Sequence, residues 1–120
     1  MKLDEYSGYD GLGLAGLVKK GDVSPRELAQ TAAQAISVVD QKVKAVVETY
    51  PDRIEGLGDG DTSDGPFAGV PFLIKDVGGH EKGRKIEFGS RLCKDMVAEF
   101  DTNLFKLLKA SGVNVLGRSN

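Results

Sequence analysis

The first forty residues carry apolar side chains at helical spacing, and this pattern predicts two helices. The first covers Tyr9 to Lys20, with Asp10 placed to cap it and Gly21 placed to end it. The second follows a capping Ser24 and runs to about Asp40. Its apolar face is formed by Leu28, Ala32, Ala35, Ile36 and Val39. Ser24 and Glu27 also have the spacing of a capping box.

Short apolar runs in the rest of the chain predict three strands. The run Ala45 to Thr49 is rich in β-branched residues and indicates a short strand. Phe72 to Ile74 lies between turn residues and is typical of a strand buried on both faces. Val113 to Leu116 follows a helix that Asp101-Thr102 begins and Gly112 ends. We expect this helix to direct four side chains inward: Leu104, Phe105, Leu107 and Leu108.

The order strand, helix, strand predicts a right-handed parallel unit for the second and third strands. The carboxyl ends of parallel strands lie on the same side, so Lys75 and residues 118–120 are expected to face one crevice. The pattern therefore predicts an α/β fold in which N-terminal helices pack on a small sheet.

The composition restricts the classes of function. The chain has 120 residues, 16 Lys+Arg and 18 Asp+Glu, which suits a single domain of net charge -2. This balance does not indicate a nucleic-acid or membrane partner. No apolar run approaches the ~18 residues of a membrane helix, and the acidic N-terminus is unlike a signal peptide, so we expect a cytoplasmic protein.

Several patterns that suggest cofactors or metals lack the context they need. Three glycines between residues 11 and 16 have the spacing of a dinucleotide-binding loop, but no strand precedes them. The acidic segment 56–65 lacks the terminal Glu and flanking helices of a calcium loop, and we interpret it as a flexible loop. His80 has no second ligand at metal spacing, which favours a surface-loop residue. Cys93 is the only cysteine and is interpreted as an inert, partly buried thiol.

The main candidate for chemistry is Lys75, at the carboxyl end of the second strand. Lysine is rarely buried without a partner or a task, and open α/β sheets place their chemistry at the carboxyl ends of strands. Burial would lower the pKa of the lysine, and a neutral amine acts as a base. An extended side chain reaching solvent, or a pair with Asp76, accounts for this lysine as well.

The residues around Lys75 resemble a known family. Gly65-Pro66-Phe67-Ala68-Gly69-Val70-Pro71, followed by Lys75-Asp76, is similar to the opening of the amidase signature family, in which Gly-Pro-Leu/Phe-Ala-Gly-Val-Pro leads into a strand ending Lys-Asp. Asp10 to Pro25, Phe88 to Arg91 and Asp101 to Asn120 resemble further segments of that family in the same order. Phe67 makes the chain look most like the bacterial amidases that include the 6-aminohexanoate-cyclic-dimer hydrolases, which act on nylon oligomers.

The resemblance implies the first strands of a mixed, largely parallel sheet and a Ser-cisSer-Lys triad that cleaves small amides. Lys75 matches the lysine base, and no metal or organic cofactor is implied. Both serines of the family lie further along than residue 120, and Ser90, Ser111 and Ser119 do not match them. Residues 1–120 are therefore expected to form the N-terminal part of a single amidase signature domain that supplies only the lysine and is inactive alone.

Three departures accompany the resemblance. Glu87 stands where the family often has threonine, Arg118-Ser119 replaces the commoner Lys-Thr, and the run Gly78-Gly79-His80 is atypical.

An alternative hypothesis is a non-catalytic α/β module that assembles through an exposed sheet edge. We expect the apolar strand Val113 to Leu116 to be that exposed edge, covered by a second copy or by a downstream chain. A Gly-Gly-Ser-Ser-Gly-Gly-Ser-like run just downstream would favour the amidase over the module.

Overall fold

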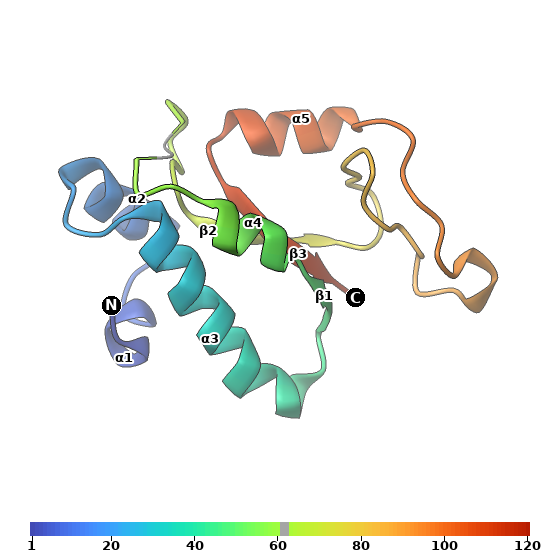
Figure 1. Cartoon of the computed structure of the whole chain (residues 1–120), viewed down its shortest axis with the longest axis horizontal. Coiled ribbons are helices and arrows are strands. Elements are labelled where there is room, and N and C mark those ends of the chain that lie inside the picture. Colours follow the sequence, from blue (N-terminus) through green and yellow to red (C-terminus); the bar gives the residue numbers. More distant parts are fainter. Residues whose placement is uncertain (61–62) are drawn as a thin grey trace.

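The computed structural model describes residues 1–60 and 63–120 as helices arranged around a small mixed sheet (Figure 1). The elements are α1 (Leu3–Tyr6), α2 (Gly11–Lys20), α3 (Pro25–Val43), β1 (Val46–Thr49), α4 (Pro51–Gly56), β2 (Pro71–Lys75), a 3₁₀ turn (Arg91–Cys93), α5 (Asn103–Ala110) and β3 (Asn114–Ser119). The segment between β2 and α5 extends beyond the sheet, at the right of Figure 1. The predicted α/β class is confirmed.

The sheet has the strand order β1-β3-β2. β3 pairs in parallel with β2, as predicted, and antiparallel with β1, which lies at an edge. The expectation that β3 would be an exposed edge is wrong. Because β3 is the central strand, both of its sides are paired, and Val115 and Leu116 are buried. The edges of the described sheet belong to β1 and β2.

The helix starts follow the predicted capping residues. The side chain of Asp10 accepts a hydrogen bond from the Gly13 N–H (2.7 Å), and Ser24 accepts one from the Glu27 N–H (3.2 Å). The carboxylate of Glu27 accepts from the amino group of Met1. α3 continues to Val43, past the predicted end, because Lys44 takes the left-handed conformation that ends it. The short helices α1 and α4 were not predicted.

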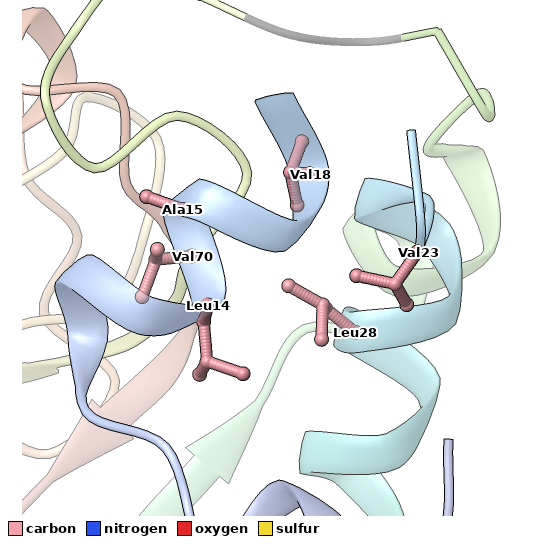
Figure 2. Close-up of a cluster of buried hydrophobic side chains, with 6 residues drawn as sticks. All are labelled: Leu14, Ala15, Val18, Val23, Leu28 and Val70. Atoms are coloured by element: carbon pink, nitrogen blue, oxygen red, sulfur yellow. The ribbon is translucent and has the colours of Figure 1, made fainter. Parts of the chain in front are cut away.

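The two faces of β3 carry separate parts of the core. On one face Leu116 packs with Ala29 and Ala32 of α3 and with Ile54 of α4. On the other face Val115 packs with Phe105 of α5, together with the buried residues Tyr50 and Ile74. A third cluster lies between α2 and the start of α3, where Figure 2 shows the buried side chains gathered: Leu14, Ala15, Val18, Val23, Leu28 and Val70.

Two expectations about burial are wrong. In α5 only Phe105 is buried and Leu108 is half-buried, whereas Leu104 and Leu107 are exposed, the latter by 69%. The reason is that the helix packs against the sheet along one narrow stripe. Phe72 is also exposed, so the described residues do not cover β2 on both faces.

The segment Gly65 to Pro71 positions β2 by backbone contacts with the turn that precedes β3. The N–H of Phe67 donates to the Ser111 carbonyl (2.8 Å), and the N–H of Gly69 donates to the Gly112 carbonyl (3.0 Å). A Cβ on Gly65 would lie 2.2 Å from the Ser111 carbonyl, so the close approach requires glycine. Of the predicted loop 56–65, residue 56 ends α4, residues 61–62 lie outside the described residues, and the remainder has no helix or strand.

Candidate functional site

Lys75 is the last residue of β2 and pairs across the ladder with Ser119 of β3. Its Nζ donates a hydrogen bond to the backbone carbonyl of Asn120 (2.7 Å). The two strand ends therefore lie together, as expected from the parallel pairing. The side chain of Lys75 is exposed, so the burial expected for it is not provided by residues 1–60 and 63–120.

The expected crevice at these strand ends is nearly filled by side chains. The cavity bordered by Lys75, Asp76, His80 and Arg118 has a volume of about 10 Å³, which is about the size needed for one water molecule. Between these particular side chains the described residues therefore leave no room for a substrate, whereas the amine of Lys75 lies outside, beside Asn120. A much larger apolar hollow, about 650 Å³, lies between α2 and α5 and reaches Pro71 and Phe72 at the other end of β2.

The side chain that fills the space is Arg118, on the central strand and only 3% exposed. Its guanidinium donates to three carboxylates, which with it we call the Arg118 cluster. Nη1 contacts Oδ1 of Asp76 (2.6 Å), Nη2 contacts Oε2 of Glu87 (2.5 Å), and Nε contacts Oε2 of Glu48 (2.9 Å). The cluster therefore connects β1, β3, the end of β2 and the loop that follows it.

Asp76 is the most enclosed acid of the cluster, at 4% exposure. Its N–H donates to the Ser119 carbonyl (2.8 Å), and its carboxylate accepts from the N–H groups of Glu87 (2.9 Å) and Gly89 (3.1 Å). Burial alone would raise the pKa of Asp76, but these two N–H donors and Arg118 outweigh it and hold the pKa below the ordinary value.

Contacts within the cluster also shift the pKa values of Glu87 and Arg118. The Asp95 N–H and the Arg118 guanidinium lower the pKa of Glu87. Burial would lower the pKa of Arg118, but hydrogen bonds to Glu87, Asp76 and Glu48 raise it. These shifts favour the ionised forms of Asp76, Glu87 and Arg118.

The loop after β2 contains the remaining residues considered from the sequence. His80 is half-buried and packs edge-on against the ring of Phe88, with centroids 5.6 Å apart, so it is less exposed than expected. The hydroxyl of Ser90 accepts from the Leu92 N–H, and that of Ser111 donates to the Leu108 carbonyl. Cys93 is a free, half-buried thiol.

Among residues 1–60 and 63–120, no three or more His, Cys, Asp or Glu side chains come together as metal ligands. Within the same residues, no helix has the length and apolar character needed to cross a bilayer.

Lys75 is a candidate from the sequence alone, whereas the Arg118 cluster beside it was not predicted. The signal that was available is the charge of Arg118 in an otherwise apolar strand. A buried arginine needs carboxylate partners, and Asp76, directly after β2, was the nearest candidate by strand register.

A mixed sheet covered by helices, with a lysine at the carboxyl end of a parallel strand pair, makes this chain an α/β protein. The family profile described as Amidase matches residues 27–120, and the chain belongs to this family. The chain spans about a quarter of the length of the curated relatives it matches, covering 25% of the first of them.

Two kinds of curated relative are similar in sequence. A glutamyl-tRNA(Gln) amidotransferase subunit of Salinispora tropica is 30% identical over 98% of this chain. The 6-aminohexanoate-cyclic-dimer hydrolase of Paenarthrobacter ureafaciens is 28% identical over 92% of this chain and 22% of its own length. The kind of hydrolase suggested by the sequence is therefore among the relatives, together with the amidotransferase subunits.

Solved structures agree with the fold. The 6-aminohexanoate cyclic dimer hydrolase complexed with substrate superposes with a TM-score of 0.80 at 27% identity, covering 93% of this chain and 23% of that one. Native peptide amidase from Stenotrophomonas maltophilia gives a TM-score of 0.79 at 27% identity, covering 96% of this chain and 25% of that one. The described sheet and helices are therefore the amidase signature fold.

Proposed function

We propose that this chain provides the lysine base of a serine-dependent amide hydrolase and that Lys75 is that base. The observation that carries the proposal is the position of Lys75 in a chain of the amidase family. It lies at the carboxyl end of β2, directly before the enclosed Asp76, and its amine is on the open side of the strand ends. We further propose that residues 1–120 are the N-terminal part of one catalytic domain and that the serines come from protein beyond them.

In the proposed reaction the neutral amine of Lys75 accepts, through a second serine, the hydroxyl proton of a nucleophilic serine. The serine oxygen forms a bond to the amide carbonyl carbon as the proton leaves. The C–N bond then breaks, and the proton passes from the lysine ammonium to the departing amine. Water cleaves the resulting ester, which releases the carboxylic acid and restores the serine. The proposed substrate is a small amide.

A lysine serves as a base only when its amine is removed from water or placed near another cation. Lys75 is exposed here, so we propose that additional protein of the amidase fold covers it in the active enzyme. The length of the relatives supports this, because about three quarters of the first relative's chain lies outside the part matched. The 120-residue chain by itself is expected to hydrolyse no amide.

The test is Lys75→Ala in the natural protein that contains these residues, assayed with a small chromogenic anilide. Removing a positioned general base should lower kcat/KM by ~10²–10⁴-fold or more. The fold should be unaffected, because an exposed side chain leaves no cavity when it is shortened. Lys106→Ala is the matched control, since Lys106 is an exposed lysine on α5.

Wild-type turnover by a folded Lys75→Ala protein would rule out the base. Absence of hydrolysis in the wild-type natural protein, across a panel of small amides, would favour the non-catalytic module.

A further inference from the structure

We propose that Glu87 and Arg118 form a positioning pair that fixes the loop 86–90 against the carboxyl end of β2 and thereby sets the location of Lys75. This inference rests on the proposed function, because the position of Lys75 matters to catalysis only if Lys75 is the base. Neither residue is proposed to touch substrate.

The first argument is that Glu87 is the one carboxylate of the Arg118 cluster that comes from the loop. Glu48 belongs to β1 and Asp76 directly follows β2, so their contacts with Arg118 hold the sheet together. The contact from Nη2 of Arg118 to Glu87, at 2.5 Å, instead joins the loop to the central strand. A fork-shaped guanidinium fixes direction as well as distance, which suits a positioning role.

The second argument is that both oxygens of Glu87 are engaged. Oε2 accepts from Arg118, while Oε1 accepts from the N–H of Asp95 (2.8 Å), on the far side of the projecting segment. The side chain therefore bridges the central strand and the returning part of the loop. Loss of its charge should loosen both attachments together.

The third argument connects the loop to Lys75. The N–H groups of Glu87 and Gly89 donate to the carboxylate of Asp76, the residue next to Lys75. When Glu87 is held by Arg118, these N–H groups stay aimed at Asp76, and the backbone at the end of β2 is fixed from two sides. Without the pair, the loop loses its charged contact with the central strand and keeps the N–H donors to Asp76, the bond from the Ile86 N–H to the Met96 carbonyl and the packing of Phe88 on His80. The N–H donors to Asp76 should then exchange with water more readily.

The two residues are also two of the three departures from the family pattern noted in the sequence, and the structure places them in direct contact. Glu87 stands in place of threonine and Arg118 in place of lysine, and together they form an ion pair. In this chain a charged side chain therefore holds the loop, at a position where the family often has the short hydroxyl side chain of threonine.

The experiment compares Glu87→Gln with Glu81→Gln. Glu81 is a matched control: it is also paired with an arginine, Arg53, and its side chain is 18% exposed against 21% for Glu87. Amide hydrogen exchange on the protein should show the N–H groups of Glu87 and Gly89 exchanging on the order of tenfold faster in Glu87→Gln. The amides of β3 should be unchanged, and Glu81→Gln should leave both sets unchanged.

Kinetics on the natural protein separate positioning from structure. In Glu87→Gln, kcat for amide hydrolysis should fall on the order of tenfold or more while KM changes less than about twofold, since misplacement of a catalytic group acts on the chemical step. Glu87→Asp keeps the charge and should recover part of the loss. Glu81→Gln should keep the wild-type kcat.

The outcomes distinguish this inference from the proposed function. If Lys75→Ala abolishes turnover and Glu87→Gln behaves like Glu81→Gln in both exchange and kcat, the positioning pair is wrong. If Lys75→Ala keeps full turnover, the proposed function is wrong, and with it the effect of the pair on catalysis. Faster exchange with a lowered kcat supports the inference.

Discussion

Replacement of Arg118 by methionine tests whether the enclosed ion cluster stabilises the fold. Methionine retains most of the length of the side chain, so the change removes charge more than volume. Asp76, at 4% exposure, would then be a buried carboxylate with no counter-charge. Removal of one partner of a buried ion pair costs ~3–5 kcal/mol.

The structure places the expected loss at the lower end of that range. Asp76 keeps its two N–H donors from Glu87 and Gly89, and the carboxylates of Glu48 and Glu87 are partly exposed and regain water. We therefore expect Arg118→Met to lower the free energy of unfolding by about 3 kcal/mol at pH 7. For a domain of this length that corresponds to a Tm lower by roughly 10 °C.

The pH dependence follows from the lowered pKa of Asp76. A carboxyl whose folded-state pKa is lowered stabilises the fold fully above its unfolded value, about 3.9. That contribution is lost as the pH falls through the folded-state value. Glu87, whose pKa is also lowered, acts in the same direction. The difference between wild type and Arg118→Met should therefore be largest near pH 7, begin to shrink as the pH falls below about 4, and be lost only below the lowered folded-state pKa of Asp76.

The assay is urea unfolding followed by circular dichroism at pH 7 and at about pH 2, below the lowered pKa, with Arg26→Met as control. Arg26 forms a surface pair with Asp59 and is 45% exposed, so its loss should cost ~0–1 kcal/mol. The double variant Arg118→Met with Asp76→Asn should be less unstable than the sum of the single variants, because the two share one interaction. A loss below 1 kcal/mol, or one of equal size at both pH values, would refute the reasoning.

Three other outcomes are expected. Leu28→Ala, at a side chain that is 0% exposed, should cost ~2–5 kcal/mol in the same unfolding assay, and a loss under 1 kcal/mol would contradict the core described here. Gly117→Ala would place a Cβ 2.3 Å from the Glu48 carbonyl and should speed hydrogen exchange in β1, whereas Gly16→Ala meets no atom within 4 Å and should be neutral or stabilising. The 120-residue chain should self-associate at micromolar concentration through its exposed apolar side chains, and Leu107→Glu should shift it toward monomer in size-exclusion chromatography with light scattering; a monomeric wild-type chain would argue against this.

The sequence predicted the parts of the fold that depend on neighbouring residues. Caps at Asp10 and Ser24 are local, so both helices begin where expected. The burial of Arg118 was not predictable in this way, because its three partners lie 31, 42 and 70 residues away in the chain. The exposure of Leu107 was missed for a related reason, since helical spacing identifies an apolar face but not whether another element covers it.

The proposed site combines a fixed backbone with a long, exposed lysine side chain. Asp76 is held by Arg118 and by three backbone hydrogen bonds, so the end of β2 has little freedom. Lys75, one residue earlier, has a long side chain, and Asn120 is the acceptor of its amine. A lysine whose backbone is fixed and whose side chain is long can direct its amine to a new partner without movement of the sheet.

In the proposed enzyme, protein that covers the open side of the strand ends has to remove water from the Lys75 amine and offer it a new partner. If a serine hydroxyl is that partner, the bond from Nζ to the Asn120 carbonyl has to break, since an amine directed at one acceptor is not aimed at the other. The bond to Asn120 should be absent from any complex in which Lys75 acts as a base.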